Sequence, residues 1–125
     1  MKIKKSSLEL VFSSLNYPIK NFSKARVRDI FVSKLTSAIK QYGEERSKIL
    51  NTLCDKDEND KPLIEDGQYV FKSKPENKEQ AVKEVDILNN EESDIEISKE
   101  IKELIENSEA ELGIGMADEL SKILR

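Results

Sequence analysis

The stretch NFSKARVRDIFVSKLTSAIKQYGEERSKILNTLC, Asn21 to Cys54, decides the fold. Apolar residues recur in it at intervals of three and four, which is the spacing of one face of an α-helix. The recurring positions are Val27, Ile30/Phe31, Leu35, Ala38/Ile39, Tyr42, Ile49/Leu50 and Leu53. Asn21 or Ser23 can cap this helix, and we expect it to run from about Lys24 to Cys54. Gly43, inside the pattern, indicates a close helix crossing or a local bend.

A short helix and a hairpin are predicted on either side of the long helix. Ser6 or Ser7 can cap the short helix, which Pro18 ends because the residue before proline avoids the helical region. Its apolar positions are Leu8, Val11, Phe12 and Leu15. After the long helix, two apolar runs flank Glu65-Asp66-Gly67-Gln68, which is the pattern of a β-hairpin with glycine at its turn.

The remaining third of the chain predicts further helices and one more strand. Pro75 opens a helix to about Leu88, with Ala81, Val82, Val85 and Leu88 as its apolar positions. The alternating Asp94-Ile95-Glu96-Ile97 is typical of a third strand, which we expect on the hairpin. Ser98 can cap a helix that turns Ile101, Leu104 and Ile105 inward. Gly113 and Gly115 end it, and Met116–Leu124 predicts a last helix through Ala117, Leu120, Ile123 and Leu124.

Together these elements predict a mainly α fold with a minor β part. A long central helix carries packed shorter helices and a small antiparallel β-hairpin. The length of 125 residues indicates a single domain, residues 1–125. We divide it into a helical part (1–54), the hairpin (61–72) and a helical, acidic part (75–125).

Composition excludes several function classes. The chain has no histidine and one cysteine, Cys54. It therefore lacks the common nucleophile pairs, an internal disulfide and a cysteine-based zinc site. No apolar run is long enough to span a bilayer. The basic start resembles a signal peptide, but its apolar run, Leu8 to Leu15, is short and interrupted. We expect a non-enzymatic protein without cofactor in a reducing cytoplasm, or in a virion.

The charge is distributed unevenly along the chain. Residues 1–48 hold eleven basic and four acidic residues, a net of +7, whereas residues 49–125 hold ten and twenty-one, a net of −11. Such an asymmetry offers different fields to different partners. The basic residues that we single out as partner-contact candidates are Lys24, Arg26, Arg28, Lys34 and Lys40. Nucleic acid is the less favoured partner, because the chain is acidic overall.

The loop DKDENDKPLIED, Asp55 to Asp66, has the acid spacing of a calcium loop. Its weak candidate ligands are Asp55, Asp57, Asn59 and Asp66. An EF-hand loop needs glycine at its sixth position and glutamate at its twelfth. Here the sixth residue is Asp60, and Pro62 occupies the eighth position. We therefore interpret the loop as a charged turn that leads from the long helix into the hairpin, and assign no metal.

Two other acidic patterns resemble functional motifs. Glu65 and Asp66 with Lys72 faintly resemble the hairpin of a metal-dependent nuclease, but the acid-x-lysine triplet is missing there. The triplet does occur at Glu100-Ile101-Lys102, in a helical pattern. Residues 76–111 could mimic a phosphate backbone, but lysines interrupt the acidic run. Exposed helix faces explain both patterns, and we predict no catalytic residue.

Three pieces of the sequence resemble a family of phage and prophage proteins of low-GC Gram-positive bacteria, catalogued as domain of unknown function 1617. They are KARVRDIF (24–31), YGEERSKIL (42–50) and DKDENDKP (55–62) leading into QYVFK (68–72). The resemblance covers roughly Lys4 to Ile97, and departs from the family at Asp60, where its members usually have glycine. It implies a phage or prophage origin, and brings no activity, cofactor or catalytic residues.

We therefore expect a small phage or prophage protein that acts by binding another protein. The partner would be a host factor or defence system that it modulates, or a phage component that it helps assemble. A homo-oligomer through the Leu35/Tyr42/Ile49 side is also considered. The alternatives are a virion or tail-associated structural protein and a nucleic-acid-binding regulator that uses the basic first third. The expected place is the host cytoplasm, with the virion as the alternative, and no membrane is involved.

Overall fold

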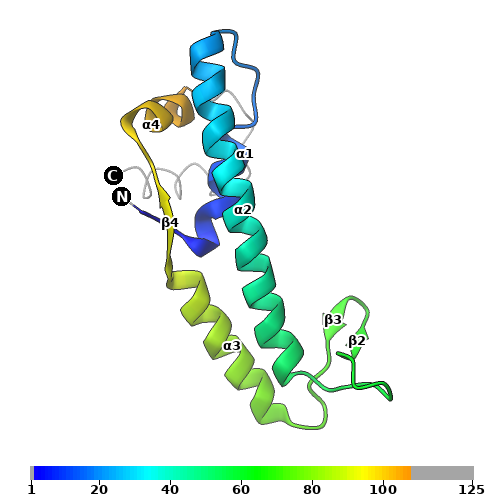
Figure 1. Cartoon of the computed structure of the whole chain (residues 1–125). Helices are drawn as coiled ribbons and strands as arrows, with labels where there is room; N and C mark the ends of the chain where they lie inside the picture. Colours follow the sequence, from blue (N-terminus) through cyan, green and yellow to red (C-terminus); the bar gives the residue numbers. More distant parts are fainter. Residues whose placement is uncertain (1, 108–125) are drawn as a thin grey trace. The chain divides into compact units, whose positions relative to one another are not determined.

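The structure is a computed structural model that describes residues 2–107. Its element order is β1 (Lys2–Lys4), a 3₁₀ turn (Lys5–Ser7), α1 (Leu8–Ser14), α2 (Phe22–Leu53), β2 (Ile64–Glu65), β3 (Gln68–Tyr69), α3 (Pro75–Asn90), β4 (Glu92–Glu96) and α4 (Lys99–Glu106) (Figure 1). The fold is mainly α with a minor β part, as predicted. The predicted helix Met116–Leu124 and its glycine stop lie outside the described residues.

The chain divides into two compact units, each described by itself. The first unit comprises Met1–Lys40 and Glu92–Arg125, and the second comprises Gln41–Glu91. Helix α2 contributes residues to both. Within residues 2–107, no helix combines the length and the hydropathy that a bilayer crossing requires.

The long helix begins where its cap predicts. The backbone N–H of Lys24 donates a 3.0 Å hydrogen bond to Oδ1 of Asn21, so Asn21, and not Ser23, is the capping residue. Gly43 does not mark a close crossing, because a Cβ built on it meets no atom within 4 Å. Helix α4 likewise begins at its predicted cap, where Ser98 Oγ accepts a 3.2 Å bond from the N–H of Ile101.

In the first unit, β1 and β4 form a two-stranded antiparallel sheet. This corrects the prediction that residues 94–97 join the hairpin. Lys2 lies opposite Glu96 and Lys4 opposite Glu92, so opposite charges face each other across the strands. Between them Ile3 and Ser93 turn inward, and Ser93 Oγ donates a 2.7 Å bond to the carbonyl oxygen of Ile3. Alternation identified a strand, but it does not specify the partner strand.

The core of the first unit is mainly aliphatic. Among the described residues its buried apolar side chains are Ile3, Leu8, Leu10, Val11, Leu15, Phe31, Leu35, Ile101, Leu104 and Ile105. The predicted inward residues of α4 are all among them. Phe31 and Leu35 are the buried positions of α2, so this helix closes the core with one narrow stripe and leaves most of its surface outside.

In the second unit, the hairpin β2–β3 forms as predicted. Ile64 pairs with Tyr69 and Glu65 with Gln68. The two turn residues, Asp66 and Gly67, have φ values of 51° and 75°. Positive φ at both central residues is the mark of a type I′ turn, whose twist matches that of the flanking strands. The hairpin therefore follows from a local signal.

Helix α3 packs in the second unit with Ala81 and Leu88 buried. Val82, predicted on its apolar face, is 56% exposed. Two side-chain contacts join α3 to α2 within this unit. Asn77 Nδ2 donates 3.1 Å to the carbonyl oxygen of Leu53, and the Tyr42 hydroxyl donates to Oδ1 of Asn89. Since Leu53 is the last residue of α2, the Asn77 amide satisfies one of its terminal carbonyls.

Candidate protein-binding surface

The five basic candidates of the sequence do not share one face. Arg28 is engaged within the chain, and Lys24 lines a groove beside α4. Arg26 and Lys34 lie together on another face of α2, while Lys40 is exposed and lines neither groove. A continuous basic surface for a polyanion would need these side chains to converge. These side chains instead lie on different faces of α2, and Arg28 is already bonded to the backbone of its own chain.

Arg28 holds the connection between α1 and α2. Its Nη1 donates to the carbonyl oxygens of Leu15 at 3.0 Å and Tyr17 at 2.7 Å, and its Nε donates 2.7 Å to Oδ1 of Asp29. The Arg28 side chain is 19% exposed. A planar guanidinium can serve several acceptors at fixed angles, which an ammonium cannot. Arg28 therefore positions a loop.

Tyr17 ties the same loop to α4. Its hydroxyl donates a 2.5 Å hydrogen bond to the carbonyl oxygen of Leu104. Burial raises the pKa of the Tyr17 phenol above its usual value of 10.0, and the nearby charge of Arg28 lowers it by less. The protonated phenol is the form that can donate this bond. Tyr17 thus has a structural contact within the first unit.

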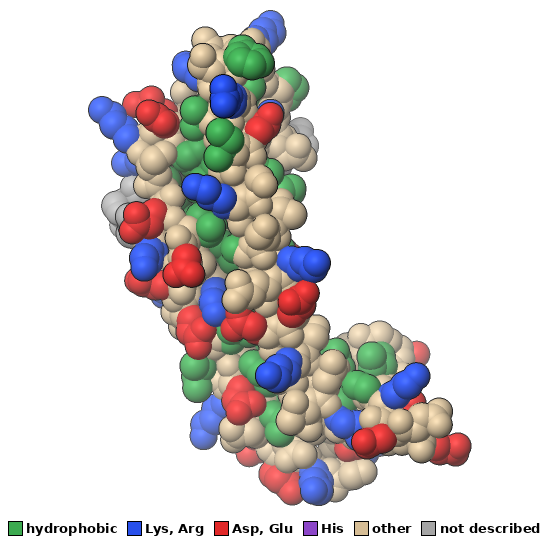
Figure 2. All heavy atoms as spheres, viewed as in Figure 1, with side chains coloured by type: hydrophobic (Ala, Val, Ile, Leu, Met, Phe, Trp, Pro, Cys, Tyr) green, Lys and Arg blue, Asp and Glu red, His purple; other side chains and the backbone are tan. Residues whose placement is uncertain are grey.

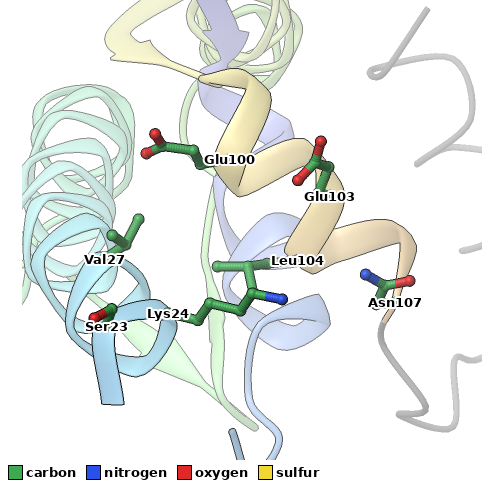
Figure 3. Close-up of a pocket in the computed structure, with 7 residues that line it drawn as sticks. All are labelled: Ser23, Lys24, Val27, Glu100, Glu103, Leu104 and Asn107. Carbon is green, nitrogen blue, oxygen red and sulfur yellow. The ribbon is translucent and has the colours of Figure 1, made fainter. Parts of the chain in front are cut away.

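A groove of about 170 Å³ lies between α2 and α4 (Figure 3). Figure 3 shows Ser23, Lys24 and Val27 on one wall, and α4 supplies the other wall. Glu100, Glu103 and Leu104 come from α4, and Asn107 directly follows its last residue. Val27 and Leu104 provide apolar surface, while the carboxylates and the Lys24 amine carry opposite charges. Because the groove carries both positive and negative charges, its lining does not indicate one class of ligand.

The other face of α2 carries the outer α2 stripe, which we define as Phe22, Ala25, Arg26, Asp29, Ile30, Ser33 and Lys34. Each of these residues lies three or four positions from another member of the set, and together they line an open depression of about 640 Å³. Phe22 is 80% exposed and Ile30 is 52% exposed. Figure 2 shows hydrophobic and basic side chains interspersed along the upper part of α2. Large exposed apolar residues among charges are typical of a contact surface.

The sequence pattern places Ile30 on the core stripe and therefore does not predict this surface. Successive residues of an α-helix are about 100° apart, so Ile30 and the buried Phe31 cannot both face the same core centre. In a helical projection with Phe31 and Leu35 facing the core, Ile30 lies about 100° away from Phe31, on the same side of the helix as Phe22 and Arg26. The sequence therefore contains the information that Ile30 is off the core face, but treating Ile30 and Phe31 as one apolar position of the pattern does not use it.

The Leu35/Tyr42/Ile49 side, considered for a homo-oligomer, is largely occupied. Leu35 has 0% exposure, Tyr42 donates to Asn89 within the second unit, and Ile49 is half-buried. The seven-residue spacing thus reflects contacts of α2 with its own chain at Leu35 and Tyr42.

The acidic loop uses its carboxylates to hold its own backbone. Asp55 Oδ2 accepts from the N–H and the hydroxyl of Ser73 at 3.0 and 3.2 Å. Asp57 Oδ1 accepts from the N–H groups of Asn59 at 2.8 Å and Lys61 at 3.0 Å. Such bonds are typical of Asx turns. Within residues 2–107, no group of three or more acidic or cysteine side chains is arranged to hold a metal ion.

The remaining candidate residues for a metal site or a nuclease do not take part in the hydrogen bonds of this loop. Asp66 occupies the first central position of the hairpin turn. Glu65 Oε2 lies 3.4 Å from Lys72 Nζ, with both side chains more than half exposed. Glu100 and Lys102 belong to α4, where Lys102 Nζ lies 3.9 Å from Glu106 Oε1. Exposed pairs of this kind contribute little to stability.

Comparisons with protein-family models, with curated proteins and with solved structures found no match for this chain.

Proposed function

We propose that this chain is a small non-enzymatic protein of a phage or prophage that acts by binding another protein in the host cytoplasm. The single observation that carries the proposal is the outer α2 stripe, with Phe22 80% and Ile30 52% exposed beside Arg26 and Lys34. The phage or prophage assignment depends on the sequence resemblance. The partner would be a host factor or a phage component.

The chemistry of the stripe specifies what a partner must present. Burying an exposed aromatic or aliphatic side chain removes apolar surface from water, which stabilises a complex by about 25 cal/mol per Å² before the costs of association. Phe22 and Ile30 would supply this apolar contact. Arg26 and Lys34 would favour a partner with carboxylates placed beside its apolar residues, since charge complementarity selects partners and speeds association.

The test is affinity capture from host and infected-cell lysates, with mass spectrometry of the bound proteins. Ile30→Glu should lose a partner that the unmodified chain retains, because it places a carboxylate in the apolar centre of the stripe. Ile87→Glu is the matched control, since Ile87 is 63% exposed on α3 and lies outside the stripe. Equal loss with both variants, or retention with Ile30→Glu, would refute the assignment of the surface.

Two further measurements separate the alternatives. A virion or tail-associated protein should be found by mass spectrometry in purified particles, whereas a modulator of a host factor should not. A nucleic-acid-binding regulator should shift DNA or RNA at low salt, with affinity that falls steeply as salt increases. A salt-sensitive shift abolished by Arg26→Glu but unaffected by Ile30→Glu would favour the regulator over protein binding.

A further inference from the structure

The outer α2 stripe carries charges of both signs close together. Arg26 and Asp29 are three residues apart on α2, which corresponds to a rise of about 4.5 Å along the helix. Asp29 accepts one bond, from Arg28 to its Oδ1, yet its side chain remains 69% exposed. An exposed cation and an exposed carboxylate therefore lie within one turn of each other on the same face.

This combination does not suit a uniformly acidic partner. Carboxylates placed along the stripe would meet Arg26 and Lys34 but would also approach Asp29, and opposed like charges weaken an interface. A surface that is complementary to the stripe must carry an acid and a base at short spacing beside apolar groups. The stripe itself meets this requirement.

We propose that the outer α2 stripe binds a second copy of this chain in an isologous contact, with Arg26 of each copy paired to Asp29 of the other. In a two-fold contact every pairing occurs twice, so this contact gains two ion pairs. Ala25 and Ser33 are small and let the two helices approach, while Phe22 and Ile30 supply apolar area on the same face. The inference rests on the proposed function, since it uses the same stripe as the binding surface, and it adds a second copy of this chain as an occupant of that stripe.

Charge reversal tests the pairing on the full chain by sedimentation equilibrium across a concentration series. Arg26→Asp alone places acids at both positions 26 and 29, and Asp29→Arg alone places bases at both, so each variant should weaken the dimer by about 10- to 100-fold. A one-to-one mixture of the two variants should restore association. The mixed dimer then has an acid opposite a base in both pairs, whereas each variant alone opposes like charges.

The mixture distinguishes contact between copies from effects within one chain. Asp29→Arg also removes the acceptor of Arg28 Nε, and any resulting loss of stability would persist in the mixture. Circular dichroism and urea unfolding of each variant measure that loss separately. An unmodified chain that stays monomeric up to millimolar concentration would overturn the proposal. A mixture that stays monomeric while the unmodified chain dimerises would overturn it as well.

The capture experiment and the sedimentation experiment together distinguish this inference from the proposed function. A monomeric chain that captures another protein through Ile30 would retain the function and refute the dimer. A dimer with the expected charge-reversal pattern, and a capture experiment that yields no other protein, would retain the dimer and refute the function.

Discussion

Ser93 and Ile3, ninety residues apart in the chain, are joined by a buried 2.7 Å hydrogen bond from the serine hydroxyl to the isoleucine carbonyl oxygen. Ser93 Oγ also accepts a 3.2 Å bond from the N–H of Ile95. The serine is 6% exposed and the isoleucine 1% exposed. One hydroxyl therefore joins β1 to β4 and also bonds to the backbone of its own strand.

Ser93→Ala should destabilise the protein by about 1–3 kcal/mol, because it leaves the buried carbonyl oxygen of Ile3 without this donor. Urea unfolding followed by circular dichroism measures the change. Ser47→Ala, at an exposed position of α2, is the control and should be neutral or slightly stabilising, since alanine favours the helix. Equal stability of the two variants would contradict the role assigned to the Ser93 hydroxyl.

Arg28→Lys should destabilise the protein by about 1–3 kcal/mol. A lysine ammonium cannot reproduce the guanidinium geometry that reaches both the Leu15 and Tyr17 carbonyl oxygens. The control is Arg26→Lys two positions earlier on the outer α2 stripe, which should change the free energy of unfolding by less than about 0.5 kcal/mol. The reverse ranking would mean that Arg28 is a surface residue and Arg26 is not.

Stability should fall as the pH rises past 10, through Tyr17. Its pKa is raised in the folded chain, chiefly by burial, so folding favours the protonated phenol. That contribution is fully present below the unfolded value of 10.0 and is lost as the pH rises through the higher folded value. Tyr17→Phe should show a shallower decline in unfolding free energy between pH 9 and 11 than the unmodified chain. Parallel declines would exclude Tyr17 as the titrating group.

Two glycine substitutions should act with opposite signs. Gly43→Ala should stabilise α2 by up to about 1 kcal/mol, because the helix interior favours alanine and the added Cβ meets nothing within 4 Å. Gly67→Ala should destabilise the hairpin by about 1–2 kcal/mol, because φ is 75° there. Thermal unfolding of both variants measures the difference. A loss of stability in Gly43→Ala would indicate a contact at that position.

Calcium should leave the melting temperature unchanged, because the carboxylates of Asp55 and Asp57 already accept hydrogen bonds within the second unit. A titration to millimolar calcium with thermal unfolding tests this expectation. Asp57→Asn retains an Oδ1 acceptor and should be tolerated, whereas Asp57→Ala should cost about 1 kcal/mol or more. A rise in Tm at micromolar calcium would show that the loop binds the ion.

Local signals in the sequence determined most of the elements. Asn21 and Ser98 cap the helices that they were expected to cap, and Asp66-Gly67 forms the predicted turn. Asp60 has a φ of 59°, which is a conformation that glycine adopts without strain. Helix caps, turns and hydrophobic periodicity depend on residues close together in the sequence, so a short stretch of sequence is enough to predict each of these elements.

Tertiary structure alone decided which elements meet and which side chains remain outside. The pairing of β1 with β4 joins strands at opposite ends of the described chain, and no local pattern encodes a partner at that separation. The same holds for Arg28. Its charge predicts a surface role, but in the folded chain its guanidinium donates to the carbonyl oxygens of Leu15 and Tyr17. Ile30 is exposed because the core receives α2 along Phe31 and Leu35. Burial is set by what packs against a residue, and hydrophobicity alone does not specify that.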